Sequence, residues 1–374
     1  MQYTEYELGE LLPFEQPTAY IVKSTDYSDA YATPVLTAGK SFILGKTNET
    51  DGIFDQLPVI IFDDFTTATQ FVNFRFKVKS SAMKILHINT DLVIPKYIFY
   101  RLQIIQFDHS THKRYWIQSY SKIKVLIPPL DEQFRIVARI EELFSELDKA
   151  VDTLKTTKEQ LEVYRQAVLK DAFSDFEKKN SIRNLTMVVT SGSRGWAKYY
   201  SNSGALFVRI GNLTHSGIDI DFRDIQHITP PDNAEGVRTR LQPNDVLVSI
   251  TADLGSIGFV SEKVEEAYIN QHIALVRFQN PVQGRFMAWY LRSEYGQKDL
   301  LKNKRGGGKL GLGLDDIRDT PVPIVDDITA KEIVDKVEEQ LSVCDSIEKT
   351  VDTALAQADA MRQSILKQAF EGTM

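Results

Sequence analysis

Apolar residues recur at every seventh position in two separate stretches of the chain. A repeat of seven is typical of the seam of a coiled coil, so each stretch predicts one long helix. Neither helix has enough apolar surface to stand alone in water, and we therefore expect the two to pair with each other. The alternative is an ordinary amphipathic helix packed in a domain core. The two rows are Ile140, Leu147, Leu154, Leu161 and Val168, and Val337, Cys344, Val351, Ala358 and Ile365.

The two helical stretches end with nearly the same sequence. Residues 164–173 read YRQAVLKDAF, and residues 361–370, which lie 197 positions later, read MRQSILKQAF. The same offset relates the two apolar rows. A repeat of this length is far longer than a solenoid unit and predicts two similar halves, each a globular domain followed by a long helix. Halves related by a pseudo-two-fold axis would pair their helices antiparallel, and such a molecule suits a two-part target.

The segment before each helix has the pattern of a small α/β domain. Apolar runs bounded by turn residues predict strands, and one short helix is expected in each half. Proline-rich elbows at 127–130 and 321–324 cannot lie inside a helix and should separate each domain from its helix. The predicted strands are 58–62, 71–78, 205–210, 245–250 and 273–278, and the short helices are 95–103 and 283–292.

These patterns predict an α+β chain with two α/β domains and an antiparallel coiled coil. We expect the domains at 1–130 and 180–324, and the long helices within 131–179 and 325–374. A length of 374 residues fits this arrangement. The single cysteine, Cys344, excludes a disulfide framework and a cysteine-based zinc site. The sequence has no signal-peptide pattern and no apolar run long enough to span a membrane, which favours the cytoplasm.

The net charge of −7 is unevenly distributed. The two domain segments carry 0 and +2, whereas the two helical segments carry −3 and −6. The acidic total therefore does not argue against binding of DNA by the domains. It suggests instead that the helices contact proteins.

Basic residues interleaved with aromatics or glycine are the candidates for contact with DNA. Lysine and arginine neutralise phosphates, and glycine allows the backbone to approach closely. The polar turn at 63–67 could read base edges. A solvated surface loop is the alternative for any one cluster. The candidates are Lys113, Arg114 and Tyr115 in the first half, and Arg194, Trp196, Lys198, Tyr199, Lys302, Lys304, Arg305 and Lys309 in the second.

No catalytic, metal or cofactor motif is apparent. The stretch Gly39-Lys40-Ser41 ends like a phosphate-binding loop, but Pro34 stands where the first glycine is required. The six histidines are scattered, apart from a pair in a basic stretch that disfavours a cation. We therefore expect a non-catalytic chain that binds no cofactor or metal of its own.

The chain resembles the specificity subunits of type I restriction–modification enzymes. The resemblance rests on the elbow and helix start at 123–133, on the repeated helix ends at 165–173 and 362–372, and on residues 245–258. At the second elbow, Val325-Asp326-Asp327 replaces the Asp-Glu-Gln of the first. The resemblance covers essentially the whole chain.

The resemblance implies two target-recognition domains, each reading one half of a bipartite, asymmetric site in double-stranded DNA. The helices would act as a ruler between them and bind two methyltransferase subunits, which carry S-adenosylmethionine and flip the target adenine. A motor-nuclease subunit would join for cleavage. Two alternatives remain: a coiled-coil scaffold whose two domains bind proteins, and an enzyme whose site is assembled from distant residues.

Overall fold

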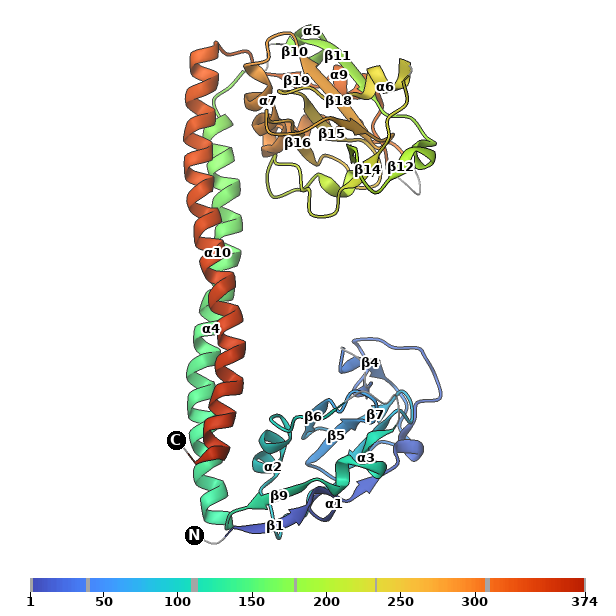
Figure 1. Cartoon of the computed structure of the whole chain (residues 1–374), viewed down its shortest axis with the longest axis vertical. Helices are drawn as coiled ribbons and strands as arrows, with labels where there is room; N and C mark the ends of the chain where they lie inside the picture. Colours follow the sequence, from blue (N-terminus) through green and yellow to red (C-terminus); the bar gives the residue numbers. More distant parts are fainter. Residues whose placement is uncertain are drawn as a thin grey trace. The chain divides into compact units, whose positions relative to one another are not determined.

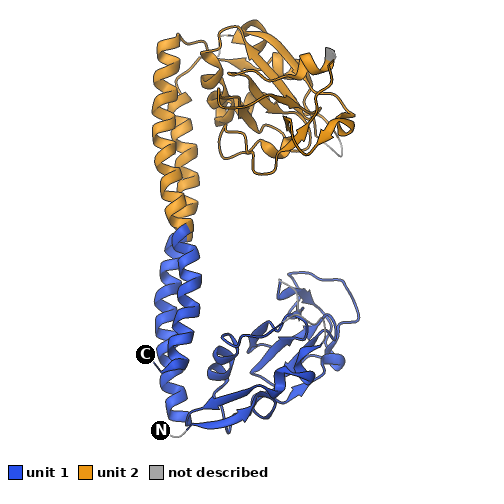
Figure 2. Ribbon diagram, viewed as in Figure 1, with its two compact units in different colours: residues 1–154, 353–374 blue, residues 155–352 orange. Residues whose placement is uncertain are grey.

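The computed structural model describes residues 3–37, 41–108, 114–177, 180–232, 234–306 and 310–372. The chain divides into two compact units (Figure 2). Unit 1 comprises residues 1–154 and 353–374, and unit 2 comprises residues 155–352. The division falls inside the long helices and not at the elbows, because each domain packs against the helical segments beside it. Each unit is described separately below.

The two long helices are α4 (Leu130–Phe173) and α10 (Asp327–Glu371) (Figure 1). In unit 2, ion pairs join Lys158 to Asp352 at 2.8 Å and Arg165 to Asp345 at 2.7 Å. The partner's number falls along α10 as the number rises along α4, so the segments are antiparallel. All ten residues predicted for the seam are buried or half-buried. The helical arrangement expected from the repeat is confirmed.

The described part of unit 1 contains two sheets of three or four strands and a two-stranded antiparallel sheet of β1 and β9. The central strand β5 lies between β8 and β6 in an antiparallel sheet of order β2-β8-β5-β6. The strands of this sheet are β2 (Phe14–Glu15), β5 (Val59–Asp63), β6 (Thr69–Val72) and β8 (Met83–Leu86). The second sheet, of order β4-β3-β7, contains β3 (Thr33–Leu36), β4 (Ile43–Thr47) and β7 (Lys77–Val78). The remaining elements are β1 (Thr4–Glu7), α1 (Leu8–Leu11), α2 (Pro95–Leu102), α3 (Tyr115–Gln118) and β9 (Lys124–Ile127).

The single strand predicted at 71–78 is wrong in this unit. The chain leaves the first sheet after Val72 and enters the second at Lys77. Between them, Phe76 exchanges backbone hydrogen bonds with Phe54 at 2.8 and 3.2 Å. The alternation of apolar residues continues across this break because both sheets bury one face.

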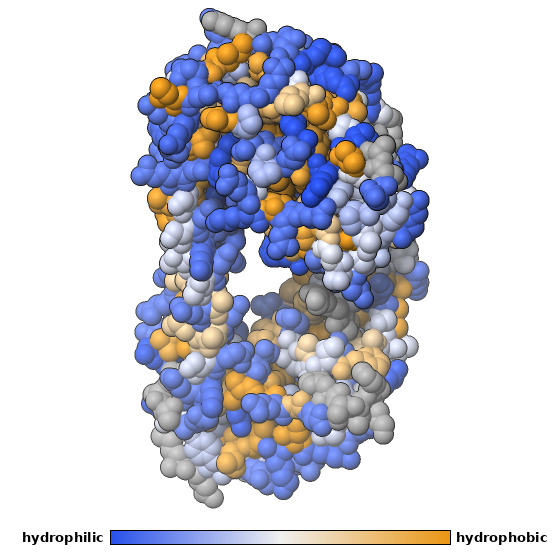
Figure 3. All heavy atoms as spheres, turned by 45° about the horizontal axis from the view of Figure 1, so that its top comes forward, coloured by the Kyte–Doolittle hydropathy of each residue, from blue (hydrophilic) through white to orange (hydrophobic). Residues whose placement is uncertain are grey.

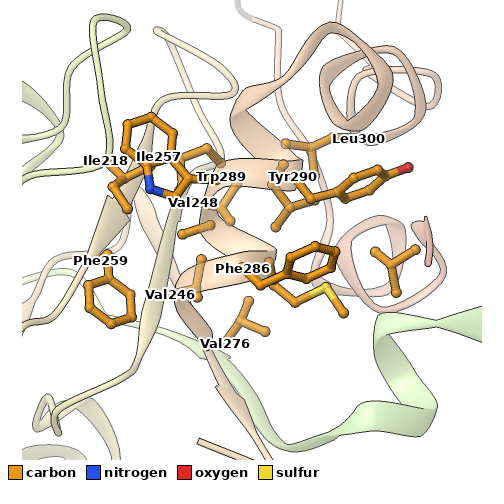
Figure 4. Close-up of a cluster of buried hydrophobic side chains, with 14 of the residues drawn as sticks. Ile218, Val246, Val248, Ile257, Phe259, Val276, Phe286, Trp289, Tyr290 and Leu300 are labelled. Atoms are coloured by element: carbon orange, nitrogen blue, oxygen red, sulfur yellow. The ribbon is translucent and has the colours of Figure 1, made fainter. Parts of the chain in front are cut away.

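Unit 2 repeats this connectivity. Its main sheet has the order β11-β18-β15-β16, and its second sheet has the order β12-β14-β13-β17. The helix α7 (Gln283–Arg292) covers the main sheet with Phe286, Trp289 and Tyr290 (Figure 4). The strands are β11 (Thr186–Ser191), β12 (Tyr200–Ser201), β13 (Ala205–Val208), β14 (Gln226–Ile228), β15 (Val246–Ser249), β16 (Ile257–Phe259), β17 (Ala267–Ile269) and β18 (Ile273–Phe278). The other elements are β10 (Asn180–Ser181), α5 (Ile182–Leu185), α6 (Ala234–Thr239), α8 (Glu294–Leu300), α9 (Leu314–Arg318) and β19 (Pro321–Val322).

The first elbow is fixed by one buried side chain of α4. The Gln133 amide accepts the N–H of Ile94 at 2.8 Å and donates to the carbonyls of Leu92 at 3.0 Å and Pro128 at 2.9 Å. Gln133 is fully buried, so these bonds satisfy its polar atoms where water cannot. They hold the domain of unit 1 against the start of its helix.

The second elbow lacks this glutamine and is closed from the opposite side. Gln283, on the domain helix α7, donates to the carbonyl of Val325 at 3.2 Å and to the carboxylate of Asp327 at 2.6 Å. Asp326 accepts the N–H groups of Ile328 and Thr329 and so caps the start of α10. At this elbow, the glutamine that joins the domain to the long helix therefore belongs to the domain, whereas at the first elbow it belongs to the long helix.

Candidate nucleic-acid interface

In unit 1, the polar turn at 63–67 follows the central strand β5. The Asp63 carboxylate accepts the N–H of Phe65 at 2.9 Å and the hydroxyl of Thr66 at 2.8 Å. Thr67 has a φ of 57°, which is rare for a β-branched residue. The aspartate thus holds a tight turn that presents Phe65, whose side chain is about half exposed.

The next residue of this turn, Asp64, supports the neighbouring basic segment. It is buried and pairs with Lys84, which is also buried, at 3.1 Å. Its carboxylate accepts the N–H of Trp116 at 2.9 Å, and its carbonyl accepts the N–H of Tyr115 at 3.0 Å. The exposed Arg114 immediately precedes these anchored residues. The structure therefore brings the predicted reading turn and the predicted basic cluster of the first half together.

In unit 2, a basic segment between α8 and α9 is hydrogen-bonded to the loop between β15 and β16. The N–H of Leu312 donates to the carbonyl of Ile250 at 2.9 Å, and Gly311 pairs with Thr251. Arg305 and Gly311 exchange backbone hydrogen bonds at 3.0 and 2.8 Å. These bonds hold the basic residues at 302–305 beside the loop that follows the central strand β15.

The other basic segment of unit 2 is held against the turn that enters β18. The N–H of Gly192 donates to the carbonyl of Asn270 at 3.2 Å. A Cβ at Gly192 would lie 2.3 Å from the carbonyl oxygen of Ile269, so only glycine fits there. The Arg238 guanidinium donates to the hydroxyl of Ser193 at 2.9 Å and fixes the segment that leads to Arg194. One basic segment of the second half is therefore held against the loop after β15, and the other against the turn before β18.

The strand that leads to this loop starts at a buried ion pair. Asp245 accepts two hydrogen bonds from the Arg277 guanidinium, each at 2.7 Å. Burial raises the pKa of the Asp245 carboxyl, and the hydrogen bonds from Arg277 oppose that rise. The pair joins β15 to β18, the two strands whose ends carry the loops described above.

Two of the predicted contacts, Tyr115 and Trp196, have buried side chains. Tyr115 packs against Phe107 with ring centroids 5.0 Å apart, and it is 4% exposed. Trp196 is 3% exposed, stacks on Phe207 and donates its ring N–H to Glu235. These two aromatic residues are therefore core residues of their domains. The candidates Arg114, Arg194, Lys198, Lys302, Lys304 and Arg305 are exposed, Tyr199 is half-buried, and Lys113 and Lys309 lie outside the described residues.

Each unit has a cleft between its domain and its pair of helical segments. In unit 1 the cleft measures about 640 Å³ and is lined by residues that include Glu141, Asp148 and Arg362. Arg362 forms an ion pair with Asp148 across the helices, and the domain residue Lys96 binds Glu141. Sequence analysis did not single out Lys96, because it lies outside the repeated motifs.

The cleft of unit 2 measures about 310 Å³ and repeats this charge pattern, with its helix residues at an offset of 197. Arg165 forms ion pairs with Asp345 at 2.7 Å and Glu348 at 2.9 Å. Arg285, on the domain helix α7, binds Glu338. The repeated arginine in the two helix ends is thus explained: each copy reaches across to an acidic residue of the other long helix.

Within the described ranges, no group of three histidine, cysteine or acidic side chains is placed to hold a metal ion. Among the same residues, no helix is both long and apolar enough to cross a membrane.

The chain is similar to DNA-specificity proteins of type I restriction systems. Residues 207–357 match the family described as type I restriction modification DNA specificity domain. The chain is 45% identical over 174 residues to the EcoR124I/EcoR124II specificity subunit of Escherichia coli, covering 43% of each protein. It is 26% identical over 281 residues to the EcoBI specificity subunit of Escherichia coli, covering 66% of this chain and 58% of that one. The chain spans about half the length of the curated relatives it matches.

The fold has a solved counterpart. A chain from a structural study of complex assembly and conformational transition of the type I R-M system superposes with a TM-score of 0.70 at 16% identity. The alignment covers 98% of this chain and 97% of that one. The two proteins therefore share the arrangement of elements along nearly their whole length.

Proposed function

We propose that the chain belongs to the type I specificity-subunit family, to which it is similar, and is the DNA-recognition subunit of a restriction–modification complex. Each domain reads one half of a bipartite, asymmetric site in double-stranded DNA. The observation that carries this proposal is the repeated placement of basic residues. In both units they lie beside the turn that follows the central strand, at 63–67 and at 250–256. Basic side chains at the same position in two domains suit two stretches of one duplex.

The two long helices are the spacer between the readers and the contact surface for partner subunits. Apolar side chains at each elbow remain exposed and recur at an offset of 194 residues. They are Leu130 and Phe134 in unit 1, exposed by 39% and 61%, and Ile324 and Ile328 in unit 2, exposed by 54% and 73%. On the face drawn in Figure 3, most of the surface is hydrophilic and hydrophobic side chains form separate groups. Two equivalent apolar patches fit two copies of one partner.

The partners we propose are two methyltransferase subunits and, for cleavage, a motor-nuclease subunit. The methyltransferase subunits bind S-adenosylmethionine and flip the target adenine out of the duplex, which an enzyme acting on a paired base requires. The present chain contributes sequence recognition and no catalytic group. Such a complex would act on DNA in the cytoplasm.

Mapping of methylated adenines tests this proposal. In cells that express the chain with its methyltransferase partner, we expect methylation at one bipartite sequence. Replacing residues 1–130 with the equivalent domain of a relative should change one half of that sequence and leave the other half and the gap unchanged. Simultaneous change of both halves would contradict the two-reader arrangement.

The main competing function is a scaffold whose two domains bind proteins. Affinity for duplex DNA that falls steeply with salt distinguishes the two, since each phosphate contact contributes a slope of roughly 0.9 in log K against log salt. Changing Lys302, Lys304 and Arg305 together to alanine should weaken binding and flatten this slope. A salt-independent interaction of the complete complex with DNA would favour the scaffold.

A further inference from the structure

In unit 1, three segments of the chain meet at Asp64. Its N–H donates to the carbonyl of Ala82 at 3.4 Å, and its carbonyl accepts the N–H of Tyr115 at 3.0 Å. The turn after β5 is thereby joined to the turn that enters β8 and to the segment that precedes α3. The exposed side chains of Phe65, in the first of these segments, and Arg114, in the third, are held near the same point.

Unit 2 has the same two backbone hydrogen bonds at Ile250. Its N–H donates to the carbonyl of His272 at 2.9 Å, and its carbonyl accepts the N–H of Leu312 at 2.9 Å. The residues Tyr115 and Leu312, which donate from the third segment, are themselves 197 positions apart. The junction therefore belongs to the internal repeat, although the residues around it differ between the halves.

Both junctions carry a strained, non-glycine residue. Thr67 in the first turn has a φ of 57°, and Ala252 in the second has a φ of 62°. Such conformations persist only where surrounding contacts impose them, and they cluster at binding and catalytic sites. Strain, exposed basic groups and divergent sequence thus coincide at one place in each unit.

In unit 2 a chain of side-chain hydrogen bonds orients an amide at this junction. The amide nitrogen of Gln271 lies 2.8 Å from Nε2 of His272, and Nδ1 of the same ring bonds the hydroxyl of Thr251. Because the amide nitrogen can only donate, Nε2 accepts, so Nδ1 carries the ring proton and donates to Thr251. The Thr251 hydroxyl proton, the second amide N–H of Gln271 and its side-chain carbonyl then remain for a ligand.

We propose that these two junctions are the base-reading sites, which deepens the proposed function and rests on it. In unit 2, Gln271 and Thr251 contact base edges, since an amide presents the donor and acceptor that match adenine in the major groove. In unit 1, Phe65 makes the apolar contact, for which a thymine methyl is the natural partner. Arg114, Lys304 and Arg305 flank the junctions and bind phosphates, which sets the position of the duplex without selecting sequence.

Variants of Gln271 in the complete complex test the reading site of unit 2. Gln271→Ala should reduce discrimination at one or two base pairs of one half-site by roughly ten- to a hundredfold. The other half-site and the gap should be unchanged. Gln271→Glu keeps the size but replaces the donor by an acceptor, so it should shift the preferred base instead of only relaxing it. The measurement is the methylated motif in cells that express each variant with its methyltransferase partner.

Gln279→Ala is the matched control, because Gln279 is an exposed glutamine just beyond the opposite end of β18. It should leave the motif intact. The reciprocal variant, Phe65→Ala, should relax only the half-site that Gln271→Ala leaves untouched.

An unchanged motif with both Gln271 variants would overturn the proposal. So would methylation that weakens equally at all positions, which is the signature of a phosphate contact, or relaxation by Gln279→Ala to the same extent. If instead the unaltered chain directs no bipartite methylation, the proposed function itself fails.

Discussion

Breaking the buried ion pair beneath the reading turn of unit 1 should cost much more than removing both of its charges. Lys84 and Asp64 have side chains that are 0% and 2% exposed, with their charged atoms 3.1 Å apart. Lys84→Met replaces the cation with an apolar side chain of similar length. It leaves the Asp64 carboxylate buried without a countercharge.

The expected loss is about 3–5 kcal/mol for a buried pair that loses one partner. Asp64 still accepts the N–H of Trp116 at 2.9 Å, so we expect the lower end of this range. In the double variant Lys84→Met, Asp64→Asn, the amide oxygen keeps that hydrogen bond while both charges are gone. We expect the double variant to lose no more than about 1–2 kcal/mol, because no uncompensated charge remains.

Hydrogen exchange followed by mass spectrometry measures this loss within unit 1 alone. A loss of 3 kcal/mol lowers protection by roughly a hundredfold, at about 1.4 kcal/mol per factor of ten. The effect should appear in peptides that cover β5 and β8, whereas peptides that cover β15 and β18 in unit 2 serve as the internal control. Equal loss of protection in the single and double variants would refute the reasoning, because the uncompensated charge would then not be the cause.

Three further outcomes are expected. Arg165→Ala should destabilise the helix pair of unit 2 by about 1–2 kcal/mol, since it removes two charge-assisted hydrogen bonds to partly exposed acids. Arg165→Lys should restore only part of the lost stability, which hydrogen exchange of the helix peptides measures. Inserting seven residues after Leu161 and seven after Glu348 keeps Lys158 opposite Asp352 and lengthens each helix by about 10.5 Å. The gap in the methylated sequence should therefore widen by about three base pairs. An active enzyme that keeps the parental gap would exclude the helices as the spacer. Burial raises the pKa of Tyr120 to about 12 from 10.0, so its stabilising contribution is complete below pH 10 and is lost as the pH rises toward 12. Tyr120→Phe should therefore shift the alkaline unfolding of unit 1 to higher pH, which circular dichroism measures.

The sequence alone determined the features that depend on local periodicity. The seam rows at Ile140 and Val337 predicted both long helices, because a repeat of seven forces one face of a helix toward a partner. The strand β18 and the helix α7 were predicted with their observed bounds, since each is a single apolar run between clear turn residues. The offset of 197 predicted two equivalent halves.

Tertiary structure decided which side chains face outward and which segments meet. Tyr115 and Trp196 stand beside basic residues in the sequence, but their side chains are buried in the cores of their own domains. The local sequence does not predict this burial. The glutamines that close the elbows, Gln133 and Gln283, sit on different elements and so share no offset. The junctions at Asp64 and Ile250 join segments up to about 60 residues apart through backbone hydrogen bonds. Every residue type except proline can both donate and accept a backbone hydrogen bond, so the types of side chain in the sequence do not predict these bonds.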